Sequence, residues 1–298
     1  MNTNKNNFLL FYGFCVFLFL TGSSCNNGIR SARSLSSSEF PEAKLGWKLG
    51  AQAYTFNLFT FFDALDKIDS CRLKYVEAFP GQTIGAGIEG TMDYHMDGGT
   101  AGKVLQKLKE KGIVLYAYGV VSPDNEADWN KLFEFGKVMG IRTFTSEPAE
   151  KDMALISELC DKYNINLAIH NHPVPKHYWN PAVVLAAIKD KSKHIGACAD
   201  IGHWVRSGLD PVECMKSLEG HILHLHMKDL NYKEGKDKGA DDRDVHWGTG
   251  IANTDGVIRE LKRQNFKGMI SAEYERNWQN NIPDVTASVL YFRKALQK

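Results

Sequence analysis

Three consecutive stretches decide the fold: INLAIH at residues 165–170, PAVVLAAIK at 181–189 and IGACAD at 195–200. The first and third are short apolar runs, which is typical of strands buried on both faces of a parallel sheet. The middle stretch opens with a proline, which suits the first turn of a helix. We therefore predict a unit of strand, helix and parallel strand, whose strands end in His170 and Asp200.

The same alternation runs from Leu45 to the C-terminus. Further strands are predicted at 49–56, 74–79, 113–121, 141–146, 221–228 and 268–274. Helices are predicted through Phe62, Leu65 and Ile68, and at 101–111, 153–163, 254–264 and 283–296. Eight such units in about 250 residues predict an α/β fold, a single (β/α)8 TIM barrel that forms the catalytic domain over residues 45–298.

Helix signals support these units. Ser122 and Pro123 predict the cap and first turn of the helix after the third strand, and Gly140 predicts its end. Asp210 and Pro211 predict the start of the helix after the sixth strand. An open doubly wound sheet is the structural alternative, but the turn after the first strand, YTFN at 54–57, is not a phosphate-binding turn.

A glycine pattern that resembles a dinucleotide fingerprint is misleading here. Gly85, Gly87 and Gly90 fit G-x-G-x-x-G, but they lie in a long loop and do not join a strand to an apolar helix. We therefore expect no nucleotide cofactor.

The N-terminus is typical of an export signal. Phe8–Leu20 is an apolar run of 13 residues, shorter than the roughly 20 that span a bilayer core. Cys25 follows small residues, as in bacterial lipoprotein signals, although Gly22 stands where Leu is usual. We expect a signal peptide at 1–24, a lipidated Cys25, a flexible tether at 25–44 and a periplasmic or outer-membrane-anchored lipoprotein. An uncleaved anchor and a plain cleaved signal are the alternatives.

Charge and cysteine content exclude several classes of protein. Loss of residues 1–24 removes Lys5 and leaves 35 basic against 35 acidic residues. A neutral chain without a basic cluster argues against a nucleic-acid partner, and any membrane contact is expected through the lipid alone. Four cysteines beyond Cys25 lack a CxxC pair, which predicts buried thiols: Cys71, Cys160, Cys198 and Cys214. The sequence leaves the oligomeric state open, a homo-oligomer included.

Five consecutive strands end in residue types that bind metals. Glu147 follows the fourth strand, His170 and His172 lie at the end of the fifth, and Asp200 and His203 at the end of the sixth. His226 lies near the end of the seventh strand, and Glu273 and Glu275 near the end of the eighth. Strand ends of a barrel meet above its centre, where such groups repel or stay unsatisfied unless a cation lies among them. We therefore predict one divalent metal, and mixed nitrogen and oxygen ligands favour Mn, Co, Zn or Fe.

These motifs resemble the xylose-isomerase-like barrel superfamily of sugar isomerases, epimerases, inosose dehydratases and endonuclease-IV-type enzymes. The likeness is carried by ADIGH at 199–203, HLHMKD at 224–229, HWGTG at 246–250 and the glutamate of SAEYE. The resemblance implies a sugar substrate and four metal ligands: His170, Asp200, His226 and Glu273. Sugar epimerases have a proton-transfer glutamate where this chain has His170.

Several further roles are expected. The resemblance implies that His203 contacts substrate, that Lys228 steadies an oxyanion and that Asp229 orients Lys228 or its loop. Glu273 and Glu147 are candidate bases, Glu147 also an extra ligand, and His172 is a second candidate for the missing proton-transfer group. Substrate contacts are also predicted for loop residues, His95, Trp204 and Trp247.

The expected chemistry is removal of the proton beside a carbonyl of an unphosphorylated keto-sugar, through an enediolate. Reprotonation makes the protein an isomerase or epimerase. Loss of a β-substituent, or its reverse, makes it a lyase or hydratase acting on 3-keto-sugars or 3-keto-glycosides, which is nearly as well supported. A phosphodiesterase and a non-catalytic, lipid-anchored sugar-binding protein are the rivals from other classes.

Overall fold

The computed structural model describes residues 40–231 and 244–297. The predicted signal, Cys25 and the tether up to residue 39 lie outside these residues. Within them no helix is long and apolar enough to cross a membrane. The end of the predicted tether is helical: α1 (Pro41–Lys44) is held by Glu42, which is buried and accepts hydrogen bonds from Arg293.

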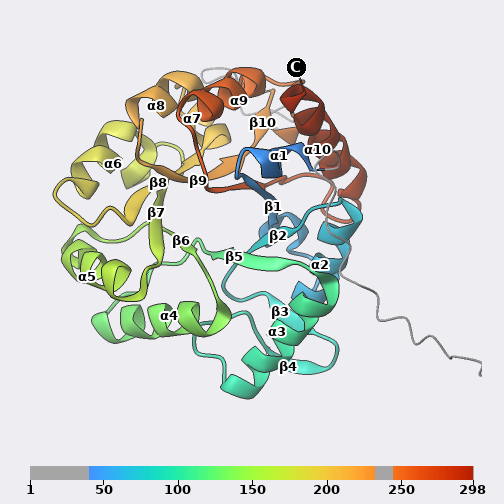
Figure 1. Ribbon diagram of the computed structural model, residues 1–298, viewed down its shortest axis with the longest axis vertical. Coiled ribbons are helices and arrows are strands. Elements are labelled where there is room, and N and C mark those ends of the chain that lie inside the picture. Colours follow the sequence, from blue (N-terminus) through green and yellow to red (C-terminus); the bar gives the residue numbers. More distant parts are fainter. Residues whose placement is uncertain (1–39, 232–243, 298) are drawn as a thin grey trace, which may run out of the picture. The chain divides into compact units, whose positions relative to one another are not determined.

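Parallel strands close into a barrel, as predicted, and helices surround it (Figure 1). The order around the barrel is β1-β12-β9-β8-β7-β6-β5-β2. The bounds are β1 Lys48–Gln52, β2 Tyr75–Ala78, β5 Val114–Tyr118, β6 Thr143–Ser146, β7 Asn166–His170, β8 Ile195–Asp200, β9 Ile222–Met227 and β12 Met269–Ala272. The parallel pairing puts the C-terminal ends of all these strands at one mouth.

The surrounding helices bury apolar faces against the barrel. In α3, for example, Val104 and Leu108 are buried, and Gly112 ends the helix in the left-handed conformation. Helix α3 spans Gly98–Lys111. The other helices around the barrel are α2 Phe61–Ser70, α4 Glu126–Met139, α5 Met153–Tyr163, α6 Pro181–Ile188, α8 Pro211–Ser217, α9 Thr254–Arg263 and α10 Ile282–Leu296. The caps predicted at Asp210 and Gly140 are confirmed.

Two local predictions are wrong. Helix α4 begins three residues after Pro123, because the Asn125 side chain accepts a hydrogen bond from the Asp128 N–H at 3.0 Å and caps it. Ser122 instead accepts the backbone N–H of Glu147. The first strand ends at Gln52, whose side chain accepts from the Tyr54 N–H and starts a 3-10 helix, η1 (Ala53–Phe56).

Three small elements near the mouth were not predicted. The glycine-rich loop forms a hairpin of β3 (Thr83–Gly85) and β4 (Ile88–Thr91), so it does not open a helix. A short helix, α7 (Ile201–Arg206), follows β8 directly. A two-stranded ribbon joins β10 (Asp229–Leu230) to β11 (Asp244–Val245). The four cysteines of the described chain are free and buried, as predicted.

Candidate active site

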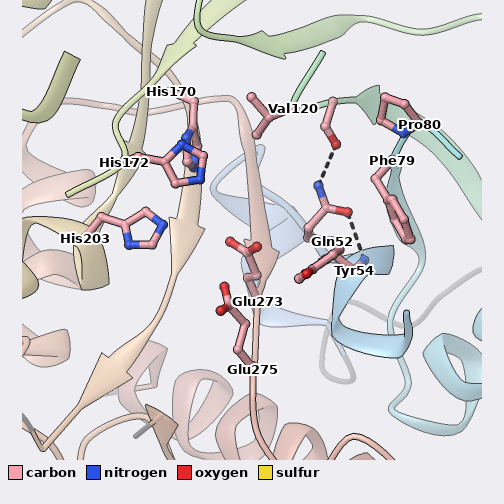
Figure 2. A pocket seen from close by; sticks show the side chains of 11 residues that line it. Gln52, Tyr54, Phe79, Pro80, Val120, His170, His172, His203, Glu273 and Glu275 are labelled. Carbon is pink, nitrogen blue, oxygen red and sulfur yellow. Dashed lines mark hydrogen bonds between the residues drawn. The ribbon is translucent and has the colours of Figure 1, made fainter. Parts of the chain in front are cut away.

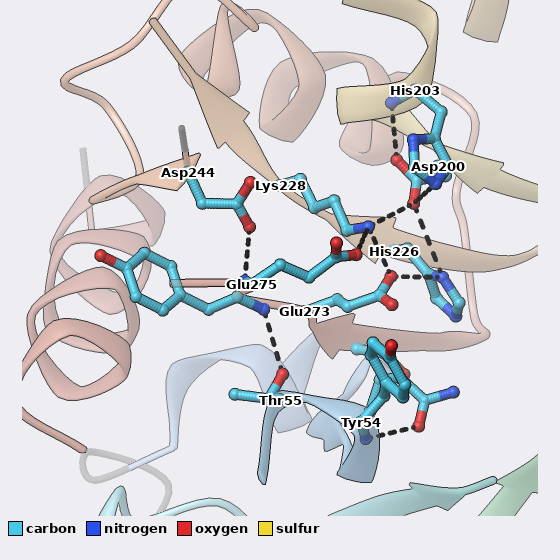
Figure 3. Close-up of polar contacts among 12 residues, drawn as sticks. Tyr54, Thr55, Asp200, His203, His226, Lys228, Asp244, Glu273 and Glu275 are labelled. Carbon is cyan, nitrogen blue, oxygen red and sulfur yellow. Dashed lines mark hydrogen bonds and ion pairs between the residues drawn. The ribbon is translucent and has the colours of Figure 1, made fainter. Parts of the chain in front are cut away.

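Four side chains converge at the mouth of the barrel. His170 ends β7, Asp200 ends β8, His226 lies in β9, and Glu273 directly follows β12. One ligand atom from each lies within 4.8 Å of all the others. His226 Nδ1 lies 2.9 Å from Glu273 Oε2 and 3.8 Å from Asp200 Oδ2 (Figure 3). The structure thus brings together the four residues carried over from the resemblance, and we call them the four-residue cluster.

The cluster contains buried polar atoms that make no well-aligned hydrogen bond: Asp200 Oδ2, His226 Nδ1 and Glu273 Oε2. Their near neighbours are one another and the Lys228 ammonium, which lies 3.3 Å from Asp200 Oδ2 and 3.1 Å from Glu273 Oε2. Buried polar atoms without well-aligned partners cost free energy, so these atoms favour a further shared cation. Two imidazoles and two carboxylates fit a divalent transition metal, whose binding here stays a prediction.

The ADIGH motif explains how Asp200 is presented. Its Oδ1 accepts the His203 N–H at 2.8 Å and caps α7, which leaves Oδ2 for the cluster. Gly202 lets α7 pack closely, since a Cβ there would lie 2.6 Å from the Cβ of Lys228. Burial raises the pKa of Asp200, but the charge of Lys228 and hydrogen bonds with His170 and His226 hold it well below its usual value.

Lys228 is fully buried beside the cluster. Its Nζ lies 3.3 Å from Asp200 Oδ2 and 3.1 Å from Glu273 Oε2, and it contacts Glu275. Burial lowers its pKa, but these carboxylates outweigh burial and raise the pKa well above the usual value. Lys228 does not line the cavity described below, so the structure places it as a counter-charge behind two of the four residues.

Asp229 organises a loop. Its carboxylate accepts hydrogen bonds from the backbone N–H groups of Gly248, Gly250 and Ala252, as well as from Leu230. A Cβ on Gly250 would lie 2.3 Å from Asp229 Oδ1, so the HWGTG loop requires glycine at this position. Of the two predicted roles for Asp229, the structure shows the second, orientation of the loop.

Glu147 lies behind His170. Its Oε1 is 3.2 Å from His170 Nδ1, and it also contacts His172 Nδ1. Burial raises the pKa of Glu147, but hydrogen bonds from the two imidazoles lower it to about 2. Since His170 Nδ1 is thus engaged, His170 Nε2 is the atom that faces Asp200, at 3.7 Å. Glu147 contacts two histidines and does not line the cavity. It also forms a group with His170 and His172 whose ligand atoms lie within 4.8 Å of one another, and its predicted roles as a base or an extra ligand stay predictions.

A cavity of about 380 Å³ opens above the cluster (Figure 2). Such a volume lies within the range of small-molecule sites. One wall is polar and charged, and the opposite wall is largely apolar. The lining residues are His170, His172, His203, Glu273 and Glu275 on the first wall, and Gln52, Tyr54, Phe79, Pro80, Gly119 and Val120 on the second.

Two of the predicted substrate-facing histidines line this cavity. The His172 side chain is 40% exposed, and Glu147 holds its Nδ1, which leaves Nε2 for the cavity. His203 is nearly buried, with Nδ1 3.0 Å from Arg206 Nη1 and Nε2 3.5 Å from Asp200 Oδ2. Burial lowers the pKa of His203 well below the usual value, so its ring is neutral.

Three residues that were predicted to contact the substrate do not line the cavity. The ring nitrogens of His95 lie 2.9 Å from Asp93 and 3.2 Å from Asp128. Trp204 is 1% exposed, packed into the core from α7. Trp247 is 3% exposed and donates its ring N–H to the Met227 carbonyl.

The aromatic residues that do line the cavity are Tyr54 and Phe79. Tyr54 follows β1 and Phe79 follows β2. Residues just after strands meet at the mouth of the barrel, so the reasoning that found the metal-binding residue types also applies to these two aromatic residues. Their rings pack edge to face, 5.3 Å apart.

Sequence reasoning also missed Glu77. It lies in β2, is fully buried and accepts hydrogen bonds from His224 and His226. Burial raises its pKa, but the two imidazoles lower it well below the usual value. The available signal was a single carboxylate inside the apolar strand YVEA, since a buried charge requires partners.

A cluster of metal-binding residue types below a cavity, at the C-terminal end of a parallel barrel, defines a class of barrel proteins with sites on the loops after the strands. The chain belongs to the xylose isomerase-like TIM barrel family, whose pattern matches residues 86–295.

Individual relatives support the same fold. A solved structure of an uncharacterized protein from Parabacteroides distasonis is 35% identical, with a TM-score of 0.68 over 84% of this chain and 99% of that one. A D-tagatose 3-epimerase-like protein is 19% identical, with a TM-score of 0.65 over 84% of this chain and 97% of that one, which shows a likeness of fold alone. An uncharacterized protein of Methanocaldococcus jannaschii is 28% identical over 52% of this chain, which spans about half (51%) of that curated relative.

Proposed function

We propose that the protein is a divalent-metal-dependent enzyme that moves the proton beside a carbonyl of an unphosphorylated keto-sugar, as an isomerase or epimerase. The observation that carries the proposal is the four-residue cluster beside the cavity, which two of its members, His170 and Glu273, line. Three buried atoms of the cluster make no well-aligned hydrogen bond. The same arrangement argues against a degenerate, non-catalytic sugar-binding protein, because such a protein has no need for these atoms.

The residues divide the work. His170, Asp200, His226 and Glu273 would hold the metal, which when bound supplies Lewis-acid polarisation of the sugar carbonyl. Glu273 lines the cavity and removes the proton, because its carboxylate is held ionised: burial raises the pKa, but the Lys228 charge beside it lowers the pKa to about 2. Lys228 stays charged and balances the carboxylates while the oxyanion forms.

His172 is the second proton-transfer group. Its Nε2 faces the cavity from a different strand end than Glu273, and Glu147 orients the ring. A carboxylate behind an imidazole fixes the ring and the tautomer, as general acid-base catalysis requires. This histidine supplies the function that the resemblance assigned to a glutamate at the position of His170.

The composition of the cavity supports an unphosphorylated substrate. Among the described residues that line it, none is Lys or Arg, although phosphate groups are usually bound by such cations. The charged wall suits hydroxyl groups, and Tyr54 and Phe79 suit the C–H face of a sugar ring.

A lyase or hydratase acting on 3-keto-glycosides is the second candidate. The observation that favours it is the replacement of an epimerase glutamate by His170, which leaves an imidazole, His172, as the group that would donate a proton to a departing β-substituent. Elimination and epimerisation share the first proton removal and differ in the product.

One experiment tests both candidates. The metal-loaded protein is incubated in D2O with a panel of free ketohexoses and 3-keto-glucosides, and the products are read by NMR. We expect deuterium at the carbon beside the carbonyl, with either an epimer or a released aglycone identifying the reaction. Saturable sugar binding without any exchange, with metal bound, would refute the proposal and support a binding protein.

We also propose that the protein acts outside the cytoplasm, anchored through lipid on Cys25. The support is the sequence of residues 1–25. Full-length protein is expected in the membrane fraction and Cys25→Ser protein in the soluble fraction. Equal membrane retention of both would contradict lipid anchoring.

A further inference from the structure

Glu77 lies inside the barrel, below the four-residue cluster, and is saturated with hydrogen bonds. Its Oε2 is 2.9 Å from His226 Nε2, 2.8 Å from His224 Nε2 and 2.7 Å from Ser271 Oγ, and Thr145 Oγ1 donates to Oε1 at 2.6 Å. These partners come from three strands, β6, β9 and β12, while Glu77 itself belongs to β2. The carboxylate is therefore held from three sides and does not line the cavity.

The position of Glu77 determines which nitrogen of His226 carries hydrogen. A carboxylate only accepts hydrogen bonds, so the Nε2 that faces Glu77 must be the N–H. The other nitrogen, Nδ1, is buried and directed at Glu273 Oε2 and Asp200 Oδ2 (Figure 3). A proton on Nδ1 is shared with these carboxylates in the metal-free protein, so a metal bound by the cluster would displace this proton and not the one that Glu77 holds on Nε2.

We infer that Glu77 is a positioning residue that fixes the tautomer and ring orientation of His226, so that this histidine binds the metal through Nδ1. The inference rests on the proposed metal site. Carboxylates behind metal-bound histidines act in this way generally, and their loss lowers metal affinity about 10- to 100-fold. Two hydroxyls and two imidazoles already contact the Glu77 carboxylate, so the inference gives Glu77 the role of orienting His226 and not that of a ligand.

A simpler role is that Glu77 only satisfies a buried polar network. The chain offers a matched control for this role. Thr145→Val removes one hydrogen bond from the same carboxylate, on Oε1, without touching His226. Glu77→Gln keeps the size of the side chain but places a neutral amide against Nε2, and its NH2 group favours the opposite tautomer. A merely structural role predicts similar effects of the two changes on metal affinity.

The test is Co²⁺ affinity, measured by titration of visible absorption on the full chain. We expect Glu77→Gln to weaken binding about 10- to 100-fold, and Thr145→Val to stay within about threefold of the wild type. Equal affinities of wild type and Glu77→Gln would overturn the inference and leave the proposed function intact. If the wild type itself binds no Co²⁺, the proposed function and the inference both fail.

A second measurement needs no variant, in case Glu77→Gln does not fold. In the zinc-loaded wild type, ¹⁵N–¹H correlation of the His226 ring is expected to place the proton on Nε2 and the metal on Nδ1. A ring proton on Nδ1, with Nε2 bound to zinc, would overturn the inference whatever the affinities are.

Discussion

Two carboxylates lie behind the two histidines of the cluster, in opposite surroundings. Glu77, behind His226, is fully buried below the four-residue cluster and accepts hydrogen bonds from three strands. Glu147, behind His170, is 21% exposed near the mouth and shares its carboxylate with His172. Glu77 thus has a single fixed geometry, whereas Glu147 also touches a side chain that lines the cavity.

This difference separates two tasks. In the proposed function, the floor of the site, with Glu77 and His226, determines how the metal is held. The mouth, with Glu147 and His172, determines how protons move, and Glu273 takes part in both tasks. Changes at the floor should therefore alter metal affinity first, changes at Glu147 or His172 should alter turnover at saturating metal, and changes at Glu273 should alter both.

The largest effect is expected from Glu273→Gln. Loss of the carboxylate that removes the proton should lower kcat about 10²- to 10⁴-fold, measured as deuterium exchange at saturating metal. Glu275→Gln is the matched control, since Glu275 lines the same cavity but stands outside the cluster. Equal losses in the two variants would break the assignment of the base.

The next largest effect concerns stability. Lys228→Met leaves Asp200 and Glu273 buried without their counter-charge, which should cost about 3–5 kcal/mol in metal-free protein. Added metal should restore much of the loss, because it supplies positive charge at the same carboxylates. Arg293→Met, which strips the buried Glu42 of its partner far from the site, should lose stability with or without metal. Thermal unfolding with and without metal measures both, and a Lys228→Met loss that metal does not reduce would count against the metal site.

Glu147→Gln sharpens the contrast with Glu77. Because Glu147 orients His172 as well as His170, the variant should lose about 10- to 100-fold in turnover at saturating metal, measured by the same exchange assay. His172→Gln should lose a similar factor, and the double variant little more, since the two residues act together. Additive losses would show that Glu147 and His172 act separately.

A smaller effect is expected on the apolar wall. Phe79→Ala should raise KM about 3- to 10-fold, because a ring contact contributes about 0.5–1.5 kcal/mol, with kcat nearly unchanged. Trp247→Phe serves as a control outside the cavity and should leave KM as it is. An unchanged KM in Phe79→Ala would show that the sugar does not contact this wall of the cavity.

The buried thiols are expected not to react with an alkylating reagent in the folded protein. Burial raises the pKa of Cys160 and Cys198 to about 12, so they stay protonated in the fold from neutral pH to well above 9 and lose this protection only as pH approaches 12. Iodoacetamide at pH 8, with peptide mapping by mass spectrometry, should label both only after unfolding. Labelling of Cys198 in the native protein would mean that the floor of the site opens.

The sequence predicts the barrel and a group of metal-binding residue types at its strand ends by local rules, and the resemblance to a known family selects the four-residue cluster from that group. Apolar strand runs alternate with helices, and His170 and Asp200 are recognisable as strand ends. Glu77 could not be placed in the same way, since its partners His224 and His226 lie 147 and 149 residues further along the chain. Only strand order brings β2 into reach of β9.

The errors concern side-chain direction in loops and short helices. His95 was expected in the cavity, but nearby Asp93 and Asp128 bind it elsewhere. Trp204 follows Asp200 in the chain, yet α7 turns it into the core. The type of a residue and its position after a strand do not determine the direction of its side chain within a six-residue helix such as α7.

The most direct test of the account is the metal itself. X-ray absorption of the protein, stripped with chelator and reloaded with zinc, is predicted to show one equivalent per chain with two imidazoles and carboxylate oxygens around it, and Asp200→Asn protein should retain none. A wild-type chain that retains no metal, or a bound ion without imidazole neighbours, would contradict the central claim that His170, Asp200, His226 and Glu273 form one metal centre.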